Sequence, residues 1–193
     1  MIKLLKVNDY KKMLWKNGEG YTFEIARSIG EYLDHFDWRI SMADVKTSGS
    51  FSKFRGMNRF LTVLEGHGIS LNIDGALHHL STLESIQFNG ESAVTCRLLD
   101  GPIRDFNLIY NPKKFTADYQ WFSTSKQFEI RLESDLSFIF NQSIEPLIVE
   151  FDQQIFHLNH QECLRVESEK SVCKLILNKQ QFTQFCLIQL IKI

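Results

Sequence analysis

The chain has 193 residues, a formal net charge of −1 and 44% hydrophobic residues, with only 3 Pro and 10 Gly. This length provides one domain or two small ones with a substantial core, and the composition excludes disordered and collagen-like proteins. The near-zero charge argues against a dedicated nucleic-acid binder, because neutralising phosphates requires an excess of Lys and Arg on one face.

The only helical signal lies at the start of the chain. Asn8 or Asp9 can cap one helical turn ahead of residues 10–14, and Gly18 and Gly20 prevent a long helix there. Short β-branched or aromatic runs follow, each bounded by Gly, Asp, Asn or Pro. They predict strands at 36–45, 59–66, 68–74, 92–99 and 103–110, with tight turns at 66–68 and 74–75.

The dipeptide Asn111–Pro112 ends the last of these strands and is the best candidate boundary within the chain. The polar and aromatic stretch 113–121 predicts a crossover connection. Further runs then predict strands at 128–134, 136–142, 146–158, 163–168, 174–178 and 185–193. Short strands joined by short turns are typical of a sandwich or barrel. Two β-rich halves, residues 1–112 and 113–193, suggest a duplicated β unit.

Several strands of the first half carry short polar residues on one face and apolar residues on the other, since neighbouring residues point to opposite faces. The polar faces hold Thr22, Glu24 and Ala26 on one strand, Arg39, Ser41 and Ala43 on the next, and Asp105 and Asn107 on a third. The simpler interpretation is a solvated sheet face. Small residues beside Arg and Glu favour the alternative, in which these faces meet inside a barrel mouth.

In the barrel-mouth interpretation, Arg39 and Arg59 each present a planar set of donors suited to a carboxylate. Glu24 and Asp105 are expected to hold these arginines in place, because a buried charge must be paired. Two asparagines, Asn17 and Asn107, supply further donors and acceptors. This pattern predicts a polar pocket for a small anion.

Metal binding and nucleophilic catalysis lack a matching pattern. No H-x-H occurs, and the adjacent His78 and His79 would point to opposite faces of a strand. We therefore expect neither a metal nor another cofactor. Cys96 lies among apolar residues and is expected to be an inert core thiol. Ser52 is either a pocket hydroxyl or a turn serine.

Several ordered blocks resemble the HutD/Ves family of cupin-like proteins. These blocks are 15–26, 36–41, 49–68, 88–90 and 96–110, whereas the C-terminal half resembles the family only in being rich in β-structure. The resemblance implies an all-β double cupin (bicupin) built from jelly-roll units, with little helix. It further implies a cytoplasmic protein associated with histidine utilisation or a stress response, without a confirmed enzymatic activity.

The resemblance also implies a set of ligand-binding residues drawn from four of the blocks. They are Lys16, Asn17, Thr22, Glu24, Arg39, Ser41, Ser52, Arg59, Asp105 and Asn107. The implied ligand is a small anionic metabolite, a carboxylate or formyl-amino acid resembling N-formylglutamate. Ser50, Arg55 and Asn58 stand where the family commonly has Pro, Pro and Asp, which affects ligand preference rather than the fold.

Three functions fit these residues. The first is a metal-independent binding protein for that metabolite. The second is a hydrolase or isomerase that uses Glu24 or Asp105 as a base and an arginine to stabilise negative charge. The third is an interaction module with Trp121 and Phe122 on its surface, although a core role explains these aromatics more simply.

The remaining expectations concern partners and location. No segment has the apolar length that a membrane-spanning helix needs, and the opening residues lack the features of a secretion signal. We expect neither a nucleic acid nor a membrane as partner, and a homodimer is the expected form of any assembly. The widely spaced Cys96, Cys163, Cys173 and Cys186 are expected to be free buried thiols.

Overall fold

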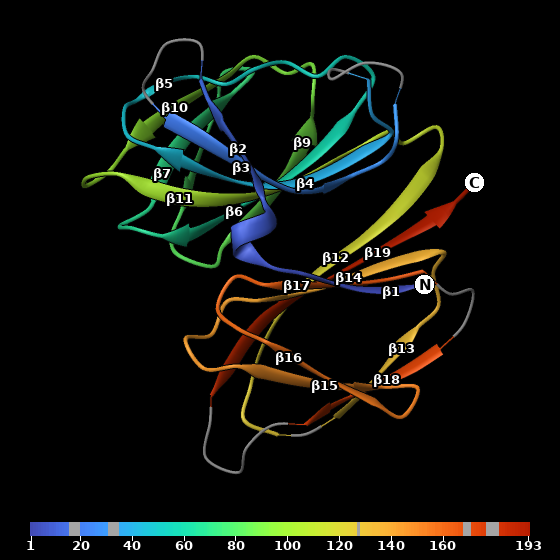
Figure 1. The fold of residues 1–193 in the computed structure, drawn as a ribbon. Coiled ribbons are helices and arrows are strands. Elements are labelled where there is room, and N and C mark those ends of the chain that lie inside the picture. Colours follow the sequence, from blue (N-terminus) through green and yellow to red (C-terminus); the bar gives the residue numbers. More distant parts are fainter. Residues whose placement is uncertain (16–19, 31–34, 127, 168–170, 177–181) are drawn as a thin grey trace. The chain divides into compact units, whose positions relative to one another are not determined.

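A computed structural model of the chain describes residues 1–15, 20–30, 35–126, 128–167, 171–176 and 182–193 (Figure 1). The described residues form strands β1 to β19 and one short 3-10 helix, Val7–Asp9. This confirms the predicted all-β class with little helix. Among the described residues, no helix is long and apolar enough to cross a membrane.

The chain divides into two compact units, residues 10–114 and residues 1–9 together with 115–193. The predicted halves, 1–112 and 113–193, differ from these units in residues 113–114 and in the first nine residues. The first nine residues belong to the second unit because β1 (Ile2–Leu5) pairs antiparallel with β17 (Cys163–Val166) near the other end of the chain.

The unit of residues 10–114 contains two antiparallel sheets. The six-stranded sheet has the order β2 (Lys11–Leu14), β3 (Gly20–Arg27), β4 (Trp38–Val45), β11 (Ile103–Tyr110), β6 (Asn58–Glu65), β9 (Ser85–Asn89). The four-stranded sheet has the order β5 (Gly49–Ser50), β10 (Val94–Leu98), β7 (Ile69–Ile73), β8 (Ala76–Leu80). Side chains from both sheets form an apolar cluster that includes Val45, Leu61, Val63, Leu71 and Ile103.

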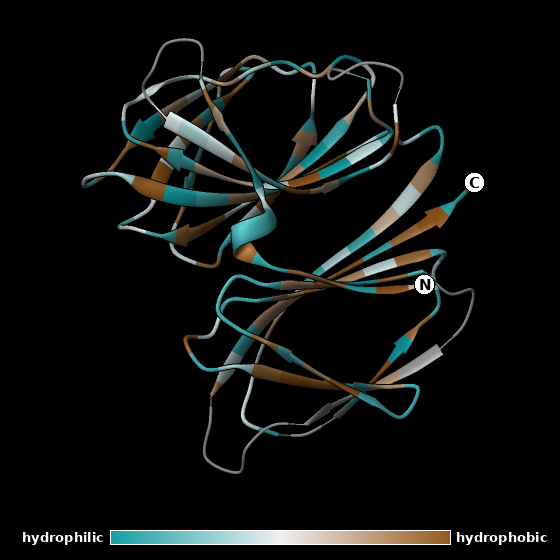
Figure 2. Ribbon diagram, in the orientation of Figure 1, coloured by the Kyte–Doolittle hydropathy of each residue, from teal (hydrophilic) through white to brown (hydrophobic). Residues whose placement is uncertain are grey.

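The other unit also contains two antiparallel sheets. The five-stranded sheet has the order β1, β17, β14 (Leu136–Asn141), β19 (Thr183–Lys192), β12 (Phe115–Thr124). The four-stranded sheet has the order β13 (Phe128–Leu132), β18 (Ser171–Ile176), β15 (Leu147–Phe151), β16 (Gln154–Leu158). Apolar and polar residues alternate along strands of both units (Figure 2), which is the pattern of sheets with one face toward a core.

The same strand order recurs in the two units, with β4 to β11 matched in sequence order by β12 to β19. Local details recur as well. The β7–β8 turn at Asp74–Gly75 and the β15–β16 turn at Asp152–Gln153 both have positive φ at their two central residues, as the favoured hairpin turns require. The predicted turn at 74–75 is therefore confirmed.

Three of the predicted elements are wrong. The expected strand at 146–158 is a hairpin of β15 and β16, because Asp152 and Gln153 form a turn between them. Residues 11–14 are a strand, and the helical turn lies just before them at 7–9. Residues 115–124 form β12 rather than a crossover, and the alternation of apolar and polar residues over 115–121 is the sequence signal for this strand. The expectation for the cysteines holds, since all four are free and buried.

The stacked rings of Phe122 and Phe185 lie in the core of the unit 1–9/115–193, and a substitution there tests that core. Phe185 has no exposed surface, and its ring centroid lies 4.9 Å from that of Phe122 at an interplanar angle of 10°. We expect Phe185→Ala to lower the free energy of unfolding by about 3–5 kcal/mol in urea denaturation, because it leaves a cavity. Phe182→Ala, at a position 63% exposed, is the matched control and should cost less than about 0.5 kcal/mol. Equal losses for the two variants would contradict this assignment of the core.

Candidate functional site

The candidate site lies on one face of the three strands β4, β11 and β6 within the unit of residues 10–114. The register aligns Arg39, Ile109 and Arg59 in one row across these strands. The next row holds Ser41, Asn107 and Leu61, and the row after it holds Ala43, Asp105 and Val63. Paired residues of antiparallel strands share a face, so both arginines and the polar residues point the same way.

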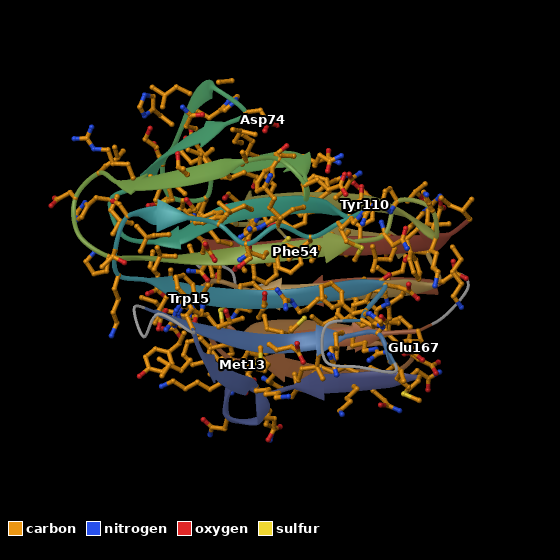
Figure 3. The ribbon with its side chains drawn as sticks, turned by 90° about the horizontal axis from the view of Figure 1, so that it is seen from above. Met13, Trp15, Phe54, Asp74, Tyr110 and Glu167 are labelled. Carbon is orange, nitrogen blue, oxygen red and sulfur yellow. The ribbon has the colours of Figure 1, made fainter. Side chains whose placement is uncertain are left out.

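An open cavity of about 1320 Å³ lies over this face. Its wall includes Met13 and Trp15 of the N-terminal segment and Phe54 of the loop 51–57, all of which are labelled in Figure 3. The indole Nε1 of Trp15 donates a hydrogen bond of 2.9 Å to the hydroxyl of Thr22, which also lines the cavity. A cavity of this size accommodates a small metabolite.

The structure brings most of the predicted site residues together. Seven of them line the cavity: Thr22, Arg39, Ser41, Ser52, Arg59, Asp105 and Asn107. Lys16 and Asn17 lie outside the described residues. That these side chains bind a ligand remains a prediction.

Glu24 and Ala26 differ from the expectation. Glu24 is not among the residues that line the cavity, and its carboxylate lies 3.6 Å from the guanidinium of Arg27. A register shift after Glu24 places Ala26 opposite Ile40. Ala26 therefore lies on the opposite face from Glu24, because a β-bulge inserts one extra residue, which the alternating pattern alone does not reveal.

A continuous hydrogen-bonded chain joins Arg59 to Asp105 through Asn107. The Nε and Nη2 atoms of Arg59 donate to the Oδ1 of Asn107 at 2.9 and 2.5 Å. The Nδ2 of Asn107 donates to the Oδ1 of Asp105 at 2.6 Å. The orientation of the Asn107 amide is fixed by chemistry, since a guanidinium only donates and an ionised carboxylate only accepts.

Burial opposes the ionisation of both Arg59 and Asp105, the two ends of this hydrogen-bonded series. Burial raises the pKa of Asp105 to about 6, while the charge of Arg59 and the hydrogen bond from Asn107 act in the opposite direction. Burial likewise lowers the pKa of Arg59 to about 10, the charge of Asp105 raises it, and the neighbouring charge of Arg39 lowers it further. The two guanidiniums are therefore close enough to repel each other, which favours an anion beside them.

Each arginine also contacts two phenylalanine rings. The guanidinium carbon of Arg39 lies 4.9 Å from the ring centroid of Phe36 and 5.1 Å from that of Phe54. The corresponding carbon of Arg59 lies 4.7 Å from Phe51 and 5.5 Å from Phe88. These rings restrict the planes of the guanidiniums and stabilise their charge.

Sequence reasoning missed these four phenylalanines, although all of them stand in the blocks that resemble the family. Phe51 and Phe54 flank Ser52 in the loop 51–57, and Phe36 and Phe88 each open one of the shorter blocks. The repeated occurrence of Phe close to the candidate polar residues was the sequence signal that could have identified them as part of the site.

The loop 51–57 is held against the turn that follows β9. The backbone N–H of Phe54 donates to the carbonyl of Gly90 at 2.7 Å, and the N–H of Gly90 donates to the carbonyl of Met57 at 2.7 Å. A Cβ atom at Gly90 would lie 2.5 Å from the Phe54 carbonyl oxygen, so any other residue would displace the loop. The close approach at Gly90 thus fixes the rings of Phe51 and Phe54 beside the arginines.

The charge of the cavity wall is predominantly positive. Five cationic side chains line it, Arg39, Lys53, Arg55, Arg59 and Lys114, against the two carboxylates of Asp37 and Asp105. Asp37 forms an ion pair of 2.8 Å with Lys114. A concave surface with an excess of one charge concentrates ligands of the opposite charge.

No metal site is evident in the part of the chain that the structure describes, where no three His, Cys, Asp or Glu side chains are grouped to hold an ion. Cys96, on β10 of the four-stranded sheet, is buried, and burial raises the pKa of its thiol to about 12. A thiol with such a pKa is a poor nucleophile at neutral pH.

The pKa of Asp105 yields a testable pH dependence of stability. In the unfolded chain this carboxyl titrates near 3.8, whereas in the folded chain its pKa is about 6. The folded state thus binds the proton more tightly, and the free energy of unfolding falls as pH rises from about 4 to about 6.

Relative to Asp105→Asn, the natural chain should lose on the order of 2–3 kcal/mol of stability over that interval and remain level above it. Urea denaturation across the range measures the difference, with Asp100→Asn at an exposed position as the control. A stability difference between Asp105→Asn and the natural chain that does not change with pH would contradict the assignment.

Comparisons with known proteins agree with this architecture. The model of the HutD family matches residues 7–184. A Pseudomonas putida protein described as an uncharacterised 21.2 kDa protein in the hutC 3′ region is 40% identical over 98% of this chain and 97% of its own length. Protein Ves of Escherichia fergusonii is 41% identical over 52% of this chain and 55% of its own length.

Solved structures extend the likeness across the whole chain. A conserved protein of unknown function from Pseudomonas aeruginosa PAO1 is 37% identical, with a TM-score of 0.93 and 99% of each chain covered. HutD from Pseudomonas fluorescens SBW25 is 36% identical, with a TM-score of 0.86 and all of each chain covered. Cupin-type structures of low identity share the fold alone, such as protein Ylba from E. coli, 10% identical with a TM-score of 0.72 over 98% of this chain and 90% of that one.

Proposed function

We propose that this chain, which belongs to the HutD family, is a metal-independent binding protein for a small anionic metabolite that carries a carboxylate. One observation supports the proposal above all others: Arg39 and Arg59 stand in one row on the face that lines the cavity. Two guanidiniums on one concave surface are a frequent means of binding carboxylates in proteins.

The hydrogen bonding of Arg59 supports a role in binding. A guanidinium has five N–H donors, and the Nε and Nη2 atoms of Arg59 are engaged by Asn107. The Nη1 end makes no side-chain hydrogen bond with a residue that the structure describes, and the contact with Asn107 fixes the plane in which its donors lie. A guanidinium held in this way loses little conformational entropy on binding, which favours affinity.

The comparisons suggest a class of ligand and a pathway. A structure of HutD from Pseudomonas fluorescens SBW25 was obtained in a formate condition, and formate is the smallest carboxylate. The Pseudomonas putida relative is encoded near hutC. We propose a formyl-amino acid resembling N-formylglutamate as the ligand, and a cytoplasmic role in regulating histidine utilisation or a stress response.

Thermal denaturation with formate, N-formyl-L-glutamate and L-glutamate tests this function. A ligand that binds the folded state raises its stability by about 2.7 kcal/mol at 100 times the dissociation constant, so Tm should rise with concentration. The variants Arg39→Lys and Arg59→Lys keep the charge but lose the planar donors. Each should weaken binding roughly 10–100-fold in calorimetry, the loss expected for charge-assisted hydrogen bonds.

Arg97→Lys is the matched control, because Arg97 lies on β10 with an exposed side chain and does not line the cavity. It should bind as the natural chain does. An unchanged Tm with every carboxylate at millimolar concentration would contradict the proposal, as would binding that survives in both Arg39→Lys and Arg59→Lys.

One observation favours an enzyme as the second candidate. Asp105 lines the cavity, and its pKa of about 6 suits a general base near neutral pH. Glu24, the other base considered from the sequence, does not line the cavity, so the hydrolase or isomerase alternative depends on Asp105. Turnover of small acids or sugars should then increase as pH rises through about 6 and disappear in Asp105→Asn. Binding without turnover across the panel would exclude this alternative.

A further inference from the structure

We propose that the cavity takes up a proton together with its anion, and that Asp105 receives the proton because it shares Arg59 with the ligand through Asn107. The inference rests on the proposed function and adds to it a coupling between ligand binding and pH.

In this geometry, the guanidinium of Arg59 interacts with two anions, the carboxylate of Asp105 and the bound ligand. Asp105 and Asn107 are two residues apart on one face of β11, and the Asn107 amide connects the carboxylate to Arg59 with hydrogen bonds of 2.5 to 2.9 Å. Asp105 and Asn107 are 1% and 3% exposed, so little water screens their interaction with Arg59. An anion bound at the Nη1 end of Arg59 places a second negative charge near Asp105. That repulsion favours the neutral form of Asp105.

Asp105 is the group expected to change its charge, because the groups that act on it from β6, β10 and β4 keep theirs. From β6 comes Arg59, whose pKa of about 10 keeps it charged at neutral pH. From β10 comes Cys96, whose pKa of about 12 keeps it neutral. From β4 come the Ala43 N–H, which donates a hydrogen bond to Asp105, and Asp44, whose charge opposes ionisation of Asp105.

Three further groups lie around this arrangement: Arg104, Arg39 and His35. The carboxylate of Asp44 is itself paired with Arg104, at 2.6 and 3.0 Å. Arg39 acts on Arg59 from the same row and attracts the same ligand. His35 also lines the cavity and is the other group whose protonation has to be separated from that of Asp105.

The sign of the coupling follows from linkage. A bound anion raises the pKa of Asp105, so by reciprocity protonated Asp105 raises the affinity for the anion. Affinity should therefore increase as pH falls from about 8 toward 6, by at most tenfold for each pH unit, and level off where Asp105 is already protonated in the free protein.

Isothermal titration calorimetry of the full chain with sodium formate tests this directly, because formate stays ionised throughout the range. The titration is run at about pH 6.5, near the pKa of Asp105, in two zwitterionic buffers of different ionisation enthalpy. We expect the measured heat to differ between the buffers, corresponding to uptake of a fraction of a proton for each formate bound. We also expect the dissociation constant to rise several-fold between about pH 6 and pH 8.

Two variants identify the group. Asp105→Asn should bind formate more tightly at neutral pH, with a heat that is the same in both buffers and an affinity that does not change with pH. His35→Gln should retain the proton uptake of the natural chain. Loss of the uptake in His35→Gln would overturn the assignment to Asp105.

The outcomes separate this inference from the proposed function. Binding of formate by the natural chain with equal heats in both buffers and a constant affinity would overturn the coupling and leave the binding function intact. Absence of binding by any carboxylate would overturn both. If Asp105→Asn does not fold, the comparison of buffers in the natural chain and in His35→Gln decides the question.

Discussion

The buried pairing of Arg59 with Asp105 is the interaction on which the site depends. Neither charge could remain in a wall that is 8% and 1% exposed at these residues without a compensating partner. Asn107 supplies the connection, and the paired strands β11 and β6 hold Arg59, Asn107 and Asp105 on one face. The charges do not balance, however, because Arg39 adds a second cation beside Arg59. This surplus is what leaves the cavity suited to an anion.

The two units show how side-chain size determines whether one strand order encloses a cavity or a packed core. In the unit of residues 10–114, Ala43 and Asp105 share a row across β4 and β11, and both line the cavity. On the matching strands β12, β19 and β14 of the other unit, one row holds Phe122, Phe185 and Asn141. The stacked rings of the two phenylalanines pack with the apolar cluster of that unit. Two phenylalanines occupy far more volume than an alanine and an aspartate. The packed interior of the unit 1–9/115–193 stabilises the folded chain, whereas the polar cavity of the unit of residues 10–114 is suited to ligand recognition.

The sequence was informative wherever a signal is local. Alternation of apolar and polar residues predicts most strands, and the same alternation places Arg39, Ser41, Asp105 and Asn107 on the polar faces. What could not be predicted depends on partners that are distant in the sequence. The bulge after Glu24 moves Ala26 to the other face, and nothing in the alternation marks an extra residue. The pairing of β1 with β17 spans most of the chain, so no local pattern reveals it.

That long-range pairing has a consequence for how the chain is made. Residues 10–114 are an insertion within the other unit, whose first strand is synthesised before the insertion and whose remaining strands come after it. During translation, the inserted unit can complete its own sheets while β1 waits for β17 to emerge. A fragment cut at the Asn111–Pro112 boundary would deprive β17 of its edge partner and leave unpaired backbone groups open to aggregation. The insertion therefore makes completion of the unit 1–9/115–193 depend on strands that are synthesised after the unit of residues 10–114.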